Sequence, residues 1–139
     1  MDYEGSCHCS AIGFRYGSEI DPQEWSVRAC QCSFCRAHDA LSTSDPDGDL
    51  EFMATDATLL QRYRFGQGTA DFLLCRNCGV YIGAAIDSGH GAFGIINIHA
   101  LKARPQQLAS SAPISYDEEN TEGRISRRGK RWTPVSRLP

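Results

Sequence analysis

Apolar and polar residues alternate with a period of two along several short segments, as they do in half-buried β-strands. The clearest case is Ile12-Gly13-Phe14-Arg15-Tyr16. Further segments with strand-like patterns follow at 50–53, 59–65, 71–75, 79–86 and 92–98. Turns are predicted at 45–48, 66–68 and 87–91, where Gly, Pro, Asp and Ser gather. The pattern predicts a mostly β protein.

Helical periodicity is weak, and only two short helices are predicted. One covers 33–40, and the other covers 105–109 with Pro105 at its first position. The expected fold is therefore mostly antiparallel β, with few short helices. We expect its sheets to be joined by metal-binding turns.

Length and composition fit one globular domain. The chain has 139 residues, of which 41% are hydrophobic and 22% charged, with a formal net charge of −3. This charge gives no general attraction to nucleic acid or to an anionic membrane. The chain contains no apolar run long enough to span a bilayer, and its first residues are acidic. We therefore expect a cytoplasmic protein.

The stretch from about Asp117 onward is polar and rich in arginine. We assign residues 1–116 to the main domain and 117–139 to an extension that packs on it or trails from it. After three acidic residues at 117–119 it carries the basic cluster Arg124, Arg127, Arg128, Lys130 and Arg131. One interpretation is a solvated edge or a loosely ordered tail, and the other is a basic wall beside an anionic ligand.

Cysteine is the unusual residue type. Seven cysteines fall into three compact groups: Cys7-His8-Cys9, Cys30-Gln31-Cys32-Ser33-Phe34-Cys35 and Cys75-Arg76-Asn77-Cys78. Cytosolic thiols stay reduced, and an odd number cannot pair completely, so a disulfide framework explains them poorly. Zn²⁺, which accepts thiolates in a tetrahedron, explains both the grouping and the glycine after Cys78.

Two divisions of the cysteines are open. Cys7 and Cys9 can complete a four-thiolate site with Cys75 and Cys78, which leaves three ligands and a vacant position at the second group. Alternatively, two members of the second group complete the site. The first division uses every cysteine and separates a closed structural site from an open catalytic one. Buried hydrophobic cysteines and a redox pair at Cys75 and Cys78 are further interpretations.

These motifs resemble the glutathione-dependent formaldehyde-activating enzymes, a family that includes the centromere protein V domain. The resemblance covers roughly residues 3–104. It is carried by Gly5-Ser6-Cys7-His8-Cys9, Cys30-x-Cys32-x-x-Cys35-Arg36, Phe72-x-x-Cys75-x-x-Cys78-Gly79 and the segment 95–98.

The resemblance implies a β-tent fold and two zinc sites. Cys7, Cys9, Cys75 and Cys78 would hold a structural zinc, and Cys30, Cys32 and Cys35 a second zinc near the active site. The family activity joins formaldehyde to glutathione, which is a carbon–sulfur lyase reaction run in reverse. A small thiol, possibly glutathione, and an aldehyde are therefore the expected partners.

The candidate catalytic residues are the three cysteines of the second group and His38. Zinc with a vacant position can bind a thiol as the thiolate and hold it near an aldehyde carbon. His38, the histidine nearest this group, is the candidate proton donor. The alternative functions are a zinc-stabilised binding module without catalysis and a redox protein. The sequence contains nothing that indicates the oligomeric state.

Overall fold

The structure is a computed structural model that describes residues 1–139. It confirms a mostly β chain with few short helices. The strands are β1 (Asp2–Ser6), β2 (Ile12–Gly17), β3 (Arg28–Cys30), β4 (Ser42–Thr43), β5 (Asp49–Ala54), β6 (Leu60–Tyr63), β7 (Asp71–Cys75), β8 (Tyr81–Asp87), β9 (Ala92–Asn97), β10 (Ala112–Ile114) and β11 (Thr133–Arg137). The α-helices are α1 (Ser33–His38) and α2 (Thr121–Arg131), and single 3-10 turns lie at η1 (Pro22–Glu24), η2 (Ala57–Leu59) and η3 (Ile98–Ala100).

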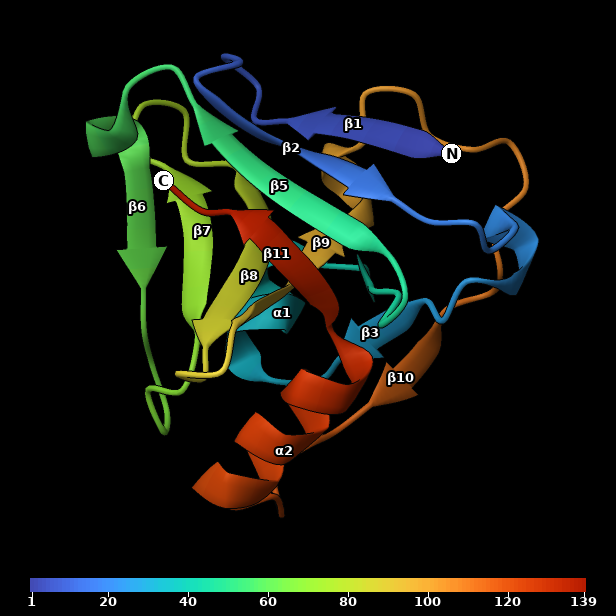
Figure 1. Cartoon of the computed structure of the whole chain (residues 1–139), viewed down its shortest axis with the longest axis vertical. Coiled ribbons are helices and arrows are strands. Elements are labelled where there is room, and N and C mark those ends of the chain that lie inside the picture. Colours follow the sequence, from blue (N-terminus) through green and yellow to red (C-terminus); the bar gives the residue numbers. More distant parts are fainter.

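All strands belong to one sheet that branches at β9 (Figure 1). One edge of β9 pairs with β8, and the sheet continues from there to β7 and β6. The other edge pairs with β11 along residues 92–94 and with β4 along residues 96–97. From β11 the sheet continues through β5 and β2 to β1, and from β4 it continues through β3 to β10. Strand β9 therefore connects the three parts of the sheet.

The main core lies where these branches pack against one another. Phe14 of β2 and Phe52 of β5 are completely buried, as are Leu73, Ile82 and Ile96 from β7, β8 and β9. The inward positions of β2 are the apolar residues of the predicted alternation. Burial of this apolar surface is the main favourable contribution to folding.

Most of the predicted elements are confirmed. Strands β2, β5, β7, β8 and β9 occupy the predicted segments within two residues, and α1 lies within 33–40. The turn at 66–68 lies between the antiparallel strands β6 and β7, and both of its glycines adopt positive φ. In the segment 59–65 only 60–63 forms a strand, because η2 ends at Leu59 and the chain turns after Tyr63.

Strand pairing is mostly antiparallel, as expected, but two parallel pairs make the sheet mixed. β10 pairs with β3, and β11 with β5, in the parallel direction. Parallel neighbours need a crossover connection instead of a tight turn. Both strands come from the C-terminal third of the chain and join strands formed much earlier in it.

The predicted helix at 105–109 is wrong. These residues form a bend and irregular chain. The amide of Ala109 donates to the carbonyl of Pro22 at 3.0 Å, and Leu108 and Ala109 pack against the main core. A helix of five residues has little intrinsic stability, so these tertiary contacts determine the local conformation.

The C-terminal stretch is neither a solvated edge nor a loose tail. It forms α2 and then β11, which lies inside the sheet between β5 and β9 (Figure 1). Trp132, directly after α2, is buried against Ala84, Ile86 and Ile95. Periodicity did not indicate this strand because only Thr133 and Val135 of β11 face the interior.

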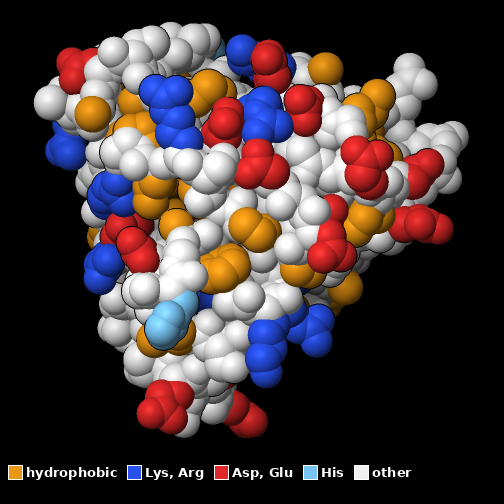
Figure 2. Space-filling model, viewed as in Figure 1, with side chains coloured by type: hydrophobic (Ala, Val, Ile, Leu, Met, Phe, Trp, Pro, Cys, Tyr) orange, Lys and Arg blue, Asp and Glu red, His pale blue; other side chains and the backbone are white.

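The surface agrees with the small net charge. Figure 2 shows acidic and basic side chains interspersed over the face that it presents. None of the helices has the length and apolar character needed to cross a membrane.

Candidate functional site

Two tight turns bring four cysteines together. Cys7 and Cys9 lie between β1 and β2, while Cys75 ends β7 and Cys78 lies in the turn before β8. Their Sγ atoms all lie within 4.8 Å of one another. The Sγ atom of Cys9 lies 3.7 Å from that of Cys7 and 3.6 Å from that of Cys75.

The backbone of both turns supports these sulfurs. The amide of Ile12 donates to the Cys7 sulfur, and the amide of Cys78 donates to the Cys75 sulfur, each at 3.4 Å. Gly79 takes a φ of +81°, which lets the chain reverse directly after Cys78. The sequence therefore folds locally into two amide-lined loops, each of which presents two sulfurs.

The four-cysteine cluster fits zinc. Zinc–sulfur bonds of about 2.3 Å in a tetrahedron place the sulfur atoms about 3.8 Å apart. The sulfur separations of 3.6 and 3.7 Å lie close to that spacing. All seven cysteines of the chain are free, so no disulfide competes for these ligands.

The other three cysteines form a separate cluster within one short segment. Cys30 ends β3, Cys32 caps the N-terminus of α1, and Cys35 lies in its first turn. Their Sγ atoms also lie within 4.8 Å of one another, and no fourth cysteine, histidine or carboxylate joins them. The cysteines are thus divided into four and three, and the alternative in which this group completes the Cys75–Cys78 turn does not occur.

The local fold of α1 produces this arrangement. The Cys32 sulfur accepts the amide of Cys35 at 3.4 Å, as a capping side chain does at a helix N-terminus. Cys35 is buried against Tyr81 of β8, and this contact fixes the helix on the sheet. The spacing C-x-C-x-x-C therefore turns all three sulfurs toward one point.

Hydrogen bonds among the sulfurs shift their proton affinities. Contacts with Cys30 and Cys35 hold the pKa of Cys32 far below that of an ordinary thiol. The pKa of Cys30 rises through its bond to Cys32, and the pKa of Cys35 rises through its bonds to Cys30 and Cys32. A lowered thiol pKa at Cys32 favours the thiolate, which is the form that binds a metal cation.

A cavity of about 380 Å³ opens beside the three-cysteine cluster. Its size lies within the usual range for small-molecule sites. Cys30, Cys32 and Cys35 all line it. The four-cysteine cluster does not border it. The two clusters therefore differ in their position relative to this cavity as well as in ligand number.

Aromatic side chains form one wall near the cluster. Phe34 of α1 lies 4.8 Å from Phe72 and 5.3 Å from Phe65, measured between ring centroids, and Tyr81 meets it edge-on at 5.0 Å. Phe65 and Phe72 line the cavity. The sequence analysis did not identify this wall, because its members come from α1, the β6–β7 connection, β7 and β8, which are separate in the chain.

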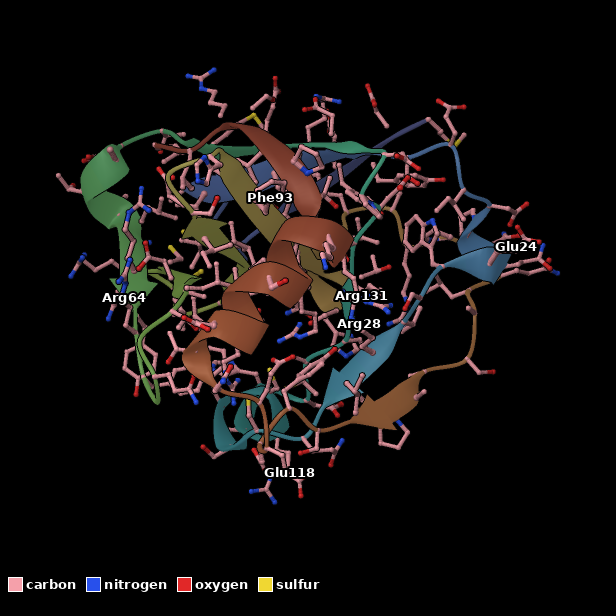
Figure 3. All side chains as sticks on the ribbon, turned by 60° about the horizontal axis from the view of Figure 1, so that its bottom comes forward. Glu24, Arg28, Arg64, Phe93, Glu118 and Arg131 are labelled. Carbon is pink, nitrogen blue, oxygen red and sulfur yellow. The ribbon has the colours of Figure 1, made fainter.

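Arginines also line the cavity, as the second interpretation of the C-terminal stretch expected of a basic wall. The anionic ligand of that interpretation stays a prediction. Arg124, Arg127 and Arg128 of α2 line the cavity, together with Arg28 of β3 and Arg36 of α1. In Figure 3, α2 crosses in front of the molecule, and Arg28 lies near its C-terminal end, where Arg131 is labelled. Arg131 does not line this cavity.

His38 lies outside the cavity lining. It is the exposed last residue of α1, and its ring packs 4.5 Å from that of Phe34. It borders a shallow depression shared with Cys78 and His99. Its role as proton donor stays a prediction.

A mostly β fold that carries one four-cysteine and one three-cysteine cluster defines a protein with two candidate metal sites. Residues 2–118 match the family model described as glutathione-dependent formaldehyde-activating enzyme, and the chain belongs to this family. The match ends just before α2, so the helix that carries three of the cavity arginines lies beyond it.

A solved structure is also similar. A crystal structure of a Rhodobacter sphaeroides protein shares 28% sequence identity over 80% of this chain and 99% of that chain, with a TM-score of 0.62. A comparison with the curated proteins found no match.

Proposed function

We propose that the protein is a zinc-dependent carbon–sulfur lyase-type enzyme that forms and cleaves a thiol–aldehyde adduct such as S-hydroxymethylglutathione. The observation that carries this proposal is the three-cysteine cluster at the wall of the 380 Å³ cavity. Catalytic zinc sites usually have three protein ligands and one open position, whereas structural sites are closed by four. The four-cysteine cluster outside the cavity suits the structural role.

Cys30, Cys32 and Cys35 would hold the catalytic ion, and Cys7, Cys9, Cys75 and Cys78 the structural one. A zinc ion on three thiolates supplies a position that favours the deprotonated form of a substrate thiol at neutral pH. The family match supports glutathione and formaldehyde as the substrates.

The reaction balances without a further reactant. The thiol sulfur bonds to the aldehyde carbon, the carbonyl double bond becomes a single C–O bond, and the proton lost from sulfur returns to that oxygen. Cleavage reverses each step. The cavity walls hold the two reactants together, and Phe65 and Phe72 keep water from one side. We propose that His38 relays the proton through water from the edge of α1.

All seven cysteines are free. Free thiols in such number require a reducing compartment to stay available as ligands. We therefore propose that the protein acts in the cytoplasm.

Exchange NMR with ¹³C-formaldehyde and glutathione tests the activity, because the adduct also forms spontaneously and only the rate reports catalysis. The zinc-loaded protein should accelerate exchange between free aldehyde and adduct without moving the equilibrium. His38→Gln should slow this exchange if the histidine carries the proton. If the protein holds two zinc ions but does not accelerate exchange for any thiol or aldehyde tested, it is a binding module. A metal-free protein with a reversible Cys75–Cys78 disulfide is a redox protein.

A further inference from the structure

Helix α2 contributes buried positive charge to the cavity. Arg128 is only 6% exposed, although it carries a guanidinium. Its Nη1 atom donates to the Thr69 hydroxyl at 2.5 Å, and its charge lies 4.8 Å from the ring centroid of Trp132. Its Nε atom is buried and has no partner. No carboxylate lies within 4.0 Å of it, so the Nε donor has no partner and the charge has no anionic one.

Arg124 repeats this pattern one helical turn earlier. Its Nη2 atom donates to the carbonyl of Tyr116 at 2.8 Å, while its Nε atom is buried without a partner. Residues four apart lie on the same helix face, and Arg124 and Arg128 both line the cavity.

Arg28 approaches from β3. Its Nη atoms donate to the Ser26 carbonyl at 3.3 Å and to the Ser44 hydroxyl at 2.8 Å, and it makes no ion pair. Arg127, in contrast, is already neutralised, because it forms two 3.1 Å bonds to the Glu119 carboxylate and stacks 3.5 Å over Tyr116. The cavity thus holds one paired arginine and several unpaired ones.

These unpaired arginine charges lower the stability of the folded protein when no anion is bound. Burial lowers the pKa of Arg128 to about 10, with further contributions from the neighbouring charges of Arg127 and Arg124. Desolvated like charges without partners oppose folding. Asp117 is the one carboxylate in the cavity wall, and it forms no ion pair. An incoming anion would satisfy these donors through charge-assisted hydrogen bonds.

We propose that Arg28, Arg124 and Arg128 bind a carboxylate of the thiol substrate, so that this chain selects thiols that carry a carboxylate. The part of this inference that concerns the thiol rests on the proposed function. The part that concerns anion binding rests on the arginines alone. The cysteine cluster and the arginines line the same cavity, so one small molecule can place its sulfur on the first and its carboxylate on the second. These arginines are specificity-determining residues, and they take no part in bond formation.

Calorimetric titration with S-methylglutathione tests anion binding separately from thiol chemistry, because this probe keeps both carboxylates and has no free thiol. Arg124→Met and Arg128→Met should each weaken its binding by about tenfold or more, the effect of losing a charge-assisted hydrogen bond. Lys130→Met is the matched control, because Lys130 is an exposed cation of the same helix outside the cavity. The Lys130→Met variant should bind S-methylglutathione with the affinity of the wild type.

Substrate discrimination supplies the second readout. The wild type should prefer 3-mercaptopropionate to its neutral amide in kcat/KM, and Arg124→Met should reduce that preference. Thermal unfolding shows whether each variant is folded. If Arg128→Met does not fold, Arg124→Met alone provides the test. Equal losses for the acid and the amide, or a wild type that does not bind S-methylglutathione, would overturn the inference. Binding of S-methylglutathione without turnover of any thiol would instead contradict the proposed function alone.

Discussion

At the scale of single residues, the two cysteine clusters place different demands on the chain. Cys9 and Cys75 are separated by 66 positions, and their sulfurs lie 3.6 Å apart. An ion bound there connects two distant turns. Cys30, Cys32 and Cys35 lie within six residues, so an ion bound there connects nothing that the chain does not already hold together.

Cys78→Ala and Cys32→Ala should therefore behave differently. Cys78→Ala should unfold or aggregate, because a structural zinc supplies free energy of folding. Cys32→Ala should stay folded, lose one metal ion and lose activity. Metal stoichiometry by native mass spectrometry and circular dichroism measure both effects. Identical behaviour of the two variants would contradict the assignment of one structural and one catalytic site.

Gly79 provides a narrower test of the four-cysteine turn. Its φ is +81°, and a Cβ at this position would meet no atom within 4 Å. Any cost of Gly79→Ala is therefore backbone strain, about 1–2 kcal/mol in the free energy of unfolding. Gly79→Asn should cost less, since asparagine tolerates positive φ better. Denaturant titration of both variants checks the order, and equal losses would indicate a cause other than φ.

At the scale of elements, α2 is a marginal helix held by its surroundings. Asn120 caps it by accepting the amide of Gly123 at 2.7 Å, and Arg128 and Trp132 fix its C-terminal end. It also contains Gly123 and Gly129, which lower its intrinsic helix stability. The arginines thus depend on packing to stay in the cavity wall.

Gly129→Ala should stabilise the protein by about 0.5–1 kcal/mol, because alanine loses less backbone entropy in a helix. Space around Gly129 is open, so its Cβ displaces nothing. Gly123→Ala is the contrasting variant. Its Cβ would lie 3.0 Å from the Glu119 side chain, so it should stabilise the protein less than Gly129→Ala does. Thermal unfolding compares the two, and a lowered Tm for Gly129→Ala would show that this position is not a regular helix interior.

At the scale of the whole molecule, the C-terminal strand completes the sheet. β11 pairs with β5 on one side and β9 on the other, so both strands lose a neighbour without it. Trp132 covers the second apolar cluster directly before this strand. The final residues therefore contribute to the central part of the fold.

A chain that ends at Arg131 should not fold. Its loss of β11 exposes backbone donors and acceptors on β5 and β9, and removal of Trp132 exposes apolar surface. A ¹H–¹⁵N correlation spectrum should collapse to the narrow dispersion of an unfolded chain. A truncated protein with a native-like spectrum would show that the strand is dispensable. Pro134→Ala, at an exposed position of the same strand, should keep the native spectrum.

The sequence by itself determined what depends on near neighbours. The apolar patterning located β2, β5, β7, β8 and β9. In β2 and β5 it is the two-residue repeat of a strand with one buried face, whereas β8 is buried on both faces. The close spacing of the cysteines within each group also predicted that their sulfurs cluster, because a short loop leaves its sulfurs little conformational freedom.

Only the tertiary structure decided what depends on distant segments. It placed Cys7 and Cys9 with Cys75 and Cys78, inserted β11 into the sheet, and kept 105–109 from forming a helix. It also brought the arginines of α2 to the cavity beside Cys30, Cys32 and Cys35. These outcomes depend on long-range packing, and local sequence patterns do not show which distant segments come into contact.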